Sequence, residues 1–95
     1  MRIYCSEEFG GELEQFVGTD IWIKAYYKSK CYWVKILSEQ SDEYSINKVL
    51  CNLDSVSSVA LGAMMNKVIT CSKYDIIPVH PIETLSTDDI LDRYE

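Results

Sequence analysis

Three consecutive runs of alternating side chains, between residues 20 and 51, constrain the fold of this chain more than any other feature. The runs cover residues 20–28, 31–37 and 43–51, and short polar turns at residues 28–30 and 39–42 separate them. Alternation with a period of two is typical of a β-strand whose two faces meet different environments. Strands joined by turns this short must lie antiparallel, so the sequence predicts a three-stranded meander.

Shorter elements are expected on both sides of this meander. They are a strand at residues 1–5, a helix over residues 11–17, strands at residues 67–71 and 74–79, and a helix at residues 87–93. Ser86 or Thr87 can cap this last helix, with acidic residues in its first turn. Pro78 and Pro81 restrict their segment to a sheet edge or an extended crossing. Residues 52–66 fit a helix and a loop equally well, because serine and glycine interrupt the helical spacing of the apolar residues.

These elements predict a mainly β fold with short helices, of the α+β class. The three strands of the meander and the strands at residues 67–71 and 74–79 make five short strands, and with a strongly bent meander they favour a small antiparallel barrel, SH3-like or OB-like, with a short N-terminal helix and a short C-terminal helix. The alternative is an α+β sandwich, in which helices cover one face of an antiparallel sheet. A chain of 95 residues is expected to form a single small domain, residues 1–95, with one core and little room for a deep cleft.

The composition is that of a globular protein without a membrane anchor. Apolar residues make up 47% of the chain, and no stretch approaches the roughly 20 apolar residues of a membrane span. Acids occupy the N-terminal region, where a secretion signal needs an apolar run. We therefore expect a cytoplasmic protein with no membrane partner. We also expect free thiols rather than disulfides at Cys5, Cys31, Cys51 and Cys71.

The stretch from Ile21 to Lys35 has a charge opposite to that of the whole chain. It contains four of the nine basic residues, both tryptophans and no acid, whereas the chain has a net charge of −6. Basic side chains interleaved with aromatic ones can hold nucleic acid or an acidic partner. The same pattern also suits a hairpin whose tryptophans cover the core while its lysines face water. The candidate binding residues are Trp22, Lys24, Tyr26, Lys28, Lys30 and Trp33.

We interpret the chain as a non-enzymatic binding module that acts by protein–protein contact, as an adaptor or an inhibitor. Trp22, Tyr26 and Trp33 would make the main contacts, because tyrosine and tryptophan dominate the energetics of protein interfaces. The alternative is nucleic-acid binding by the same hairpin, although a pI near 4.7 opposes attraction to phosphates. A homo-oligomer formed through a strand edge is a further option for the partner.

The sequence predicts no catalytic residue, no metal site and no cofactor. His80 lies between two prolines, and no serine or cysteine has the surroundings of a known nucleophile motif. Asp88 and Asp92 share a helix face but lack the spacing of a calcium loop. The lysine and hydroxyl residue that complete a phosphate loop do not follow Gly10 and Gly11.

Overall fold

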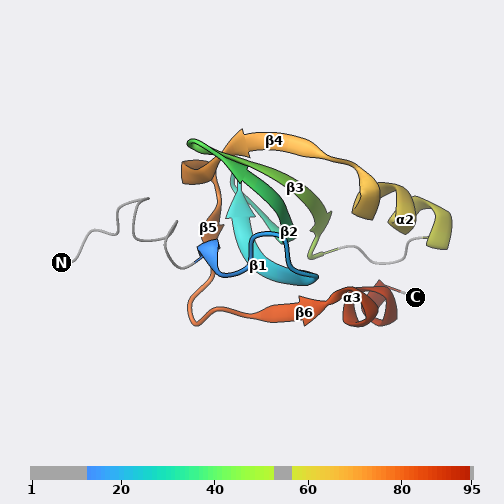
Figure 1. Ribbon diagram of the computed structural model, residues 1–95. Coiled ribbons are helices and arrows are strands. Elements are labelled where there is room, and N and C mark those ends of the chain that lie inside the picture. The colour runs from blue at the N-terminus through green and yellow to red at the C-terminus, as the bar shows by residue number, and fades with distance from the viewer. Residues whose placement is uncertain (1–12, 53–56, 95) are drawn as a thin grey trace.

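The computed structural model describes residues 13–52 and 57–94 (Figure 1). Its main element is a six-stranded sheet in which every pairing is antiparallel. The strands are β1 (Ile21–Tyr27), β2 (Lys30–Gln40), β3 (Glu43–Leu50), β4 (Ile69–Ser72), β5 (Ile77–Pro78) and β6 (Thr84–Ser86). The helices are α2 (Ser58–Asn66), α3 (Thr87–Tyr94) and the short 3-10 helix η1 (Lys73–Asp75). The predicted mainly antiparallel β fold with short helices is therefore confirmed.

The meander is present with the expected strand order. Trp22 of β1 lies opposite Lys35 of β2, and Trp33 of β2 lies opposite Val49 of β3. β2 continues to Gln40, beyond its expected end, because a register shift after Ile36 keeps it paired with β3 up to the turn. The sheet order is β4-β3-β2-β1-β5, with β6 also beside β1. No pairing between β4 and β5 joins the ends of this order in the described residues, so a closed barrel is not confirmed.

The second edge of β1 is shared by two short strands. Residues Ile21–Ile23 pair with β6, and Ala25 and Tyr26 pair with β5. The proline segment therefore lies at the sheet edge, as predicted. The strand expected at residues 74–79 is wrong in its first part, because Lys73–Asp75 form η1. The Ser72 hydroxyl accepts a hydrogen bond from the Tyr74 amide (3.2 Å) and so stabilises this turn.

Both described α-helices begin at a serine cap. The Ser57 hydroxyl accepts a hydrogen bond from the Ala60 amide (3.1 Å) and caps α2. This helix occupies most of residues 52–66, the segment for which the sequence fitted a helix and a loop equally well. At α3, the Ser86 hydroxyl accepts from the Asp89 amide (3.2 Å), and the Asp89 carboxylate accepts from the Ser86 amide (3.3 Å). This reciprocal pair is a capping box and confirms the predicted start of the C-terminal helix.

The whole strand expected at residues 1–5, and the first two residues of the helix expected at 11–17, fall outside the described residues. Within the described part of that helix, only Leu13 and Glu14 are helical, and residues 15–18 form turns, so the helix ends earlier than expected. Gly18 has a φ of 76° and donates its amide to the Ile36 carbonyl (2.9 Å). Neither α2 nor α3 is long and apolar enough to span a membrane.

Apolar side chains form one cluster on each face of the sheet. α2 and α3 lie at the same end of the molecule (Figure 1), and we call the face that they cover the helix face. The cluster on this face contains Trp22, Trp33, Val49, Leu61, Met65, Ile90 and Tyr94. The cluster on the opposite face contains Leu13, Ile23, Ala25, Tyr27, Val34, Ile36, Tyr44, Ile46, Cys71 and Ile76. The sheet is thus apolar on both faces at the end where the helices pack.

Candidate functional site

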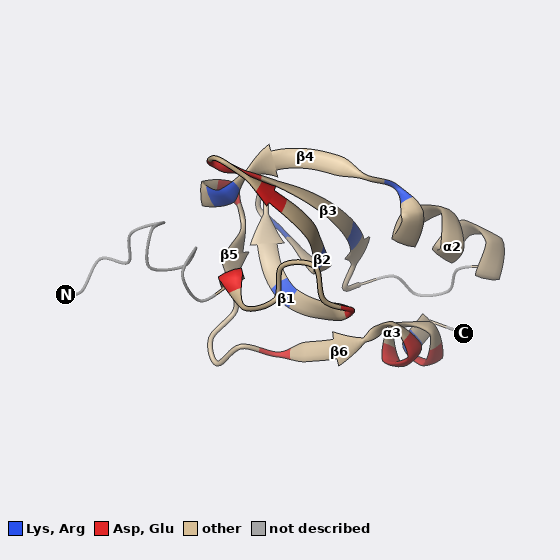
Figure 2. Ribbon diagram, viewed as in Figure 1, with Lys and Arg blue, Asp and Glu red and all other residues tan. Residues whose placement is uncertain are grey.

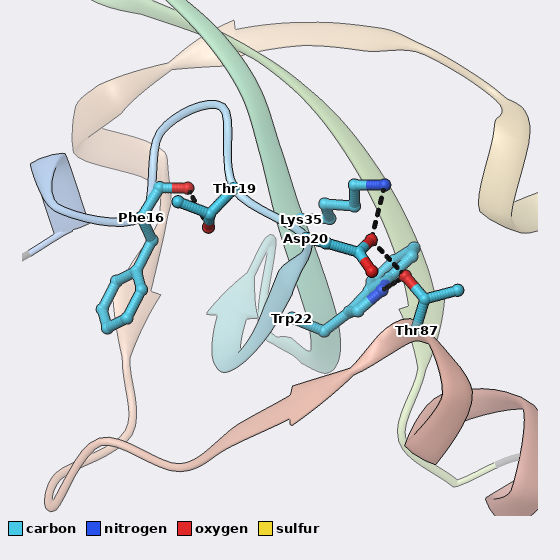
Figure 3. Close-up of polar contacts among 6 residues, drawn as sticks. All are labelled: Phe16, Thr19, Asp20, Trp22, Lys35 and Thr87. Carbon is cyan, nitrogen blue, oxygen red and sulfur yellow. Dashed lines mark hydrogen bonds and ion pairs between the residues drawn. The ribbon is translucent and has the colours of Figure 1, made fainter.

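Trp22 is buried between the sheet and α3, with 1% of its surface exposed. Its indole Nε1 donates to the Thr87 hydroxyl (3.0 Å), which donates to Asp20 (2.5 Å), and Asp20 lies 3.2 Å from the Lys35 ammonium (Figure 3). The Thr87 hydrogen bond, followed by that of Lys35, lowers the pKa of the Asp20 carboxyl. Trp22 therefore links the start of α3 to β1 through its hydrogen bond, and its side chain is not exposed to solvent.

Trp33 is also buried, with 3% of its surface exposed. Val49 lies opposite it on β3, and the Arg93 guanidinium lies 5.6 Å from the centre of its ring. The expectation that the two tryptophans form surface contacts is thus corrected. The physical reason is that α2 and α3 cover this end of the helix face. The alternation of side chains within one strand does not indicate which face of the sheet other elements will cover.

The basic residues of the hairpin are divided between the two faces. Lys30 lies opposite Tyr27, and the Lys28 ammonium lies 5.3 Å from the centre of the Tyr27 ring. Tyr27 belongs to the cluster on the face away from the helices. Lys24, in contrast, lies beside Trp33 and Tyr26 on the helix face. The structure therefore does not bring the predicted lysines together into one surface.

Part of the helix face is left uncovered, beyond the reach of α2 and α3. There Tyr26 of β1 lies opposite Ile77 of β5, and the two side chains are 49% and 47% exposed. On its other side Tyr26 lies opposite Cys31 of β2. Because opposite residues of paired strands share a face, these side chains form a row across the sheet. We call Tyr26 and Ile77 the exposed pair.

A cleft of about 260 Å³ opens beside this row, and we call it the hairpin cleft. Its lining consists of Lys24, Tyr26, Cys31, Trp33, Cys51, Asn52 and Arg93. Three of these residues were predicted from the sequence: Lys24, Tyr26 and Trp33. Cys31, Cys51, Asn52 and Arg93 were not. A second hollow of about 230 Å³ lies between α2 and α3 against Trp22.

Among the described residues, the lining of the hairpin cleft includes two cations and no acid. The Lys24 ammonium is 3.8 Å from the Glu83 carboxylate, a distance that leaves a weak, partly exposed ion pair. Arg93 is held in place by its contact with Trp33 and by its neighbour Tyr94, whose hydroxyl donates to the Leu50 carbonyl (2.8 Å). Acidic residues instead gather at the β2–β3 turn and on α3 (Figure 2). Within the described part of the lining, an anionic group would therefore meet Lys24 and Arg93 and no carboxylate.

Two of the residues that line this cleft are cysteines. The sulfur atoms of Cys31 and Cys51 are 3.3 Å apart, and both residues carry free thiols. Burial, helped by the hydrogen bond to Cys31, raises the pKa of the Cys51 thiol to about 12. No group of three or more histidine, cysteine or acidic side chains suited to a metal ion occurs in residues 13–52 and 57–94. The described lining of the cleft offers binding groups, and it includes neither a histidine nor a carboxylate that could act as a base for the thiols.

Comparison of the chain with models of protein families, with curated proteins and with solved structures finds no match. The function of the site must therefore be inferred from its own geometry. Part of that geometry follows from the hairpin alone, because the register that pairs Trp22 with Lys35 also places Cys31 opposite Tyr26. The position of Arg93 has no such local signal, since it depends on how α3 packs against Trp33.

Proposed function

We propose that this protein is a non-enzymatic binding module that captures a protein partner through the hairpin cleft and the exposed pair. The element it would capture is an acidic segment, with one carboxylate entering the cleft and a neighbouring apolar side chain resting on Tyr26 and Ile77. A single observation carries this proposal. In a chain with a net charge of −6, Lys24 and Arg93 face a cleft whose described lining has no acid, directly beside two half-exposed apolar side chains.

The chemistry of these groups supports an acidic partner. Arginine and lysine form charge-assisted hydrogen bonds with carboxylates, which are roughly twice as strong as neutral ones. Tyrosine and arginine are also enriched among the residues that dominate protein interfaces. Attraction between opposite charges would steer the partner to this face, while the acidic remainder of the surface would repel other acidic proteins.

The size of the hairpin cleft supports a side chain rather than a separate small molecule. Pockets for small-molecule ligands usually have volumes of about 300–1,000 Å³ and enclose most of the ligand. The hairpin cleft is smaller, about 260 Å³, and is open to solvent beside the exposed pair. It is therefore better suited to one side chain of a partner segment whose neighbouring residues contact Tyr26 and Ile77.

The alternative proposal, nucleic-acid binding by the same hairpin, receives less support from the geometry. It needs exposed aromatic planes alongside a continuous row of cations. Trp22 and Trp33 are buried, and Lys24 and Lys30 lie on different faces of the hairpin. Binding of a labelled oligonucleotide, followed by fluorescence anisotropy at two salt concentrations, tests this alternative. A change in tryptophan fluorescence is a poor probe here, because both indoles are buried.

A cytoplasmic location is part of the proposal. Cys31, Cys51 and Cys71 carry free thiols, as proteins in a reducing compartment usually do. A homo-oligomer remains one outcome of the test, because an acidic segment of a second copy of this chain could occupy the same cleft. Sedimentation over a range of protein concentrations separates self-association from capture of a different protein.

The test is selection of peptides from a random display library against the wild-type protein. We expect the selected peptides to contain aspartate or glutamate next to an aliphatic or aromatic residue. Lys24→Ala and Tyr26→Ala should each weaken their binding by roughly 10-fold, or about 1.4 kcal/mol. Tyr74→Ala is the matched control, since Tyr74 is similarly exposed but belongs to η1. Selected peptides without acidic residues, or with equal affinity for Tyr26→Ala and the wild-type protein, would contradict the proposal.

A further inference from the structure

Cys31 and Cys51 occupy directly opposite positions at the ends of β2 and β3. The pairing of Tyr32 with Leu50 continues by one residue, because the Cys51 amide donates to the Cys31 carbonyl (3.1 Å). The two sulfur atoms are 3.3 Å apart. The backbone ladder therefore holds the two thiols in contact.

This geometry is close to that of a disulfide. A disulfide bond has a sulfur–sulfur distance of about 2.05 Å and forms between residues whose α-carbons are about 4.4–6.8 Å apart. Hydrogen-bonded residues opposite each other in an antiparallel pair have α-carbons about 5.5 Å apart. Bond formation therefore needs only a small movement of the two side chains. Cys71, in contrast, belongs to the cluster on the opposite face of the sheet.

We propose that Cys31 and Cys51 form a reversible oxidation site that low-molecular-weight disulfides, such as glutathione disulfide, convert into a cross-strand disulfide. In the first step one of the two cysteines, as its thiolate, attacks one sulfur of glutathione disulfide, which forms a mixed disulfide and releases one glutathione thiolate. In the second step the sulfur of the other cysteine attacks the protein sulfur of the mixed disulfide and displaces the second glutathione, which takes up the proton. The two cysteines are oxidised, and one glutathione disulfide is reduced to two glutathione molecules.

Both thiols can take part in the exchange. Burial raises the pKa of the Cys51 thiol, and the two sulfur atoms are in contact, so whichever cysteine forms the mixed disulfide has the second sulfur beside it. Both cysteines line the open hairpin cleft, and both are half-buried rather than enclosed. A small disulfide can therefore reach them. Lys24 and Arg93 partly oppose the raised pKa of the Cys51 thiol, but burial outweighs them.

This site does not depend on the proposed protein partner, although the two share the hairpin cleft. Oxidation would remove two hydrogen-bonding thiols from the lining of the cleft and fix the ends of β2 and β3 together. We expect the disulfide to raise the temperature of unfolding, because it closes the chain segment between residues 31 and 51. Peptide binding and disulfide formation are separate readouts, so either proposal can fail while the other stands.

The test uses the full-length chain in its native state, with glutathione disulfide in excess, followed by alkylation of the remaining thiols and digestion with trypsin. Lysines at positions 30, 35, 48, 67 and 73 separate the cysteines into different peptides. We expect peptide 31–35 to be linked to peptide 49–67, with Cys71 alkylated in its own peptide. Reduction should restore both free peptides, and Cys5→Ser should leave the linkage unchanged.

Three results would overturn the proposal. They are a stable glutathione adduct on either cysteine without ring closure, a linkage that involves Cys5 or Cys71, or two alkylated thiols at Cys31 and Cys51. Cys31→Ser and Cys51→Ser provide independent readouts, because in each variant the remaining cysteine of the pair should form a glutathione adduct and no linkage between peptides. The matched variant Cys71→Ser should form the linkage as readily as the wild-type protein. Circular dichroism checks that each variant folds.

Discussion

Tyr26 and Ile77 lie directly opposite each other on β1 and β5, and each leaves about half of its side chain exposed to solvent. This pair exists only because β5 occupies the edge of β1 next to the hairpin turn. The pair also borders the hairpin cleft, which Tyr26 helps to line. Exposed apolar contact area and two cations are thus combined on one face of an acidic protein, which is the basis of the proposed function.

The covering of the helix face by α2 can be tested with two substitutions in the same helix. Leu61 is 1% exposed and packs in the cluster with both tryptophans, whereas Val59 is 84% exposed. We expect Leu61→Ala to lower the free energy of unfolding by about 2–5 kcal/mol, because it removes buried contacts and leaves a cavity. Val59→Ala should change it by less than about 0.5 kcal/mol. Urea unfolding followed by tryptophan fluorescence measures both, and equal effects would contradict this packing.

The capping box of α3 should make a measurable contribution to stability. Ser86→Ala removes the hydroxyl that accepts the Asp89 amide, and we expect it to lower the free energy of unfolding by about 1 kcal/mol. Ser86→Asp keeps an acceptor at the same position and should retain most of this contribution. Thermal unfolding of the three proteins at one pH is the measurement, and identical midpoints for Ser86→Ala and the wild-type protein would contradict the assignment.

The contact of Thr87 with Asp20 and Trp22 should make stability depend on pH in the acidic range. Because the pKa of Asp20 is lowered in the folded state, its contribution is fully present above the ordinary value of 3.8 and is lost as the pH falls through the folded pKa. Thr87→Val removes the Thr87 hydroxyl. This hydroxyl donates to Asp20, which is the largest cause of the lowered pKa, and accepts the hydrogen bond of the Trp22 indole. We expect a loss of about 1 kcal/mol near pH 7. The difference in the free energy of unfolding between Thr87→Val and the wild-type protein should decrease at lower pH.

Thr87→Ser serves as the matched control for this prediction, because it keeps the hydroxyl group. Unfolding in urea at a series of pH values from neutral to acidic gives the two curves. A constant difference between Thr87→Val and the wild-type protein across the whole range would show that Asp20 does not titrate as described.

The turn between β1 and β2 has an unusual choice of residues. Lys28 and Ser29 have φ values of 50° and 68°, in the left-handed region that two-residue hairpin turns of this type require. Glycine adopts this region without the steric cost that other residues meet. We expect Ser29→Gly to raise the free energy of unfolding by about 0.5–1 kcal/mol. Ser45→Gly, in the middle of β3, should lower it by a similar amount. Chemical unfolding distinguishes the two signs, and a loss of stability in Ser29→Gly would contradict the turn geometry.

The elements that the sequence predicted correctly have signals within a few neighbouring residues. Alternation from Ile21 onward fixes which side chains share a face, and a two-residue turn at Lys28 and Ser29 then fixes the register of β1 and β2. The start of α3 was equally predictable, since Ser86 and Asp89 form their capping box within one turn. Neither feature needs contacts from a distant part of the chain.

The remaining features depend on contacts between distant segments. Alternation separates Trp22 from Ile23 but cannot show which face is exposed, because both faces are covered at the end where α2 and α3 pack. α2 forms despite its serine and glycine content because Leu61 and Met65 are buried against the sheet. The short strands β5 and β6 pair only where they meet the free edge of β1. For the same reason the sequence pointed to Lys24 and Tyr26 of the hairpin cleft but not to Arg93 and Cys51, which line the same cleft.

The most direct measurement is an NMR titration of the isotope-labelled protein with an acidic peptide obtained from the display selection. The proposed function predicts that the largest amide shifts occur at Lys24, Tyr26, Cys31, Ile77 and Arg93, around the hairpin cleft and the exposed pair. Amides at Val59 and Tyr74 should stay unchanged. Saturable shifts centred on the opposite face, around Tyr27, Tyr32 and Lys48, would contradict the assignment of the binding surface, and so would shifts confined to the edge of β4.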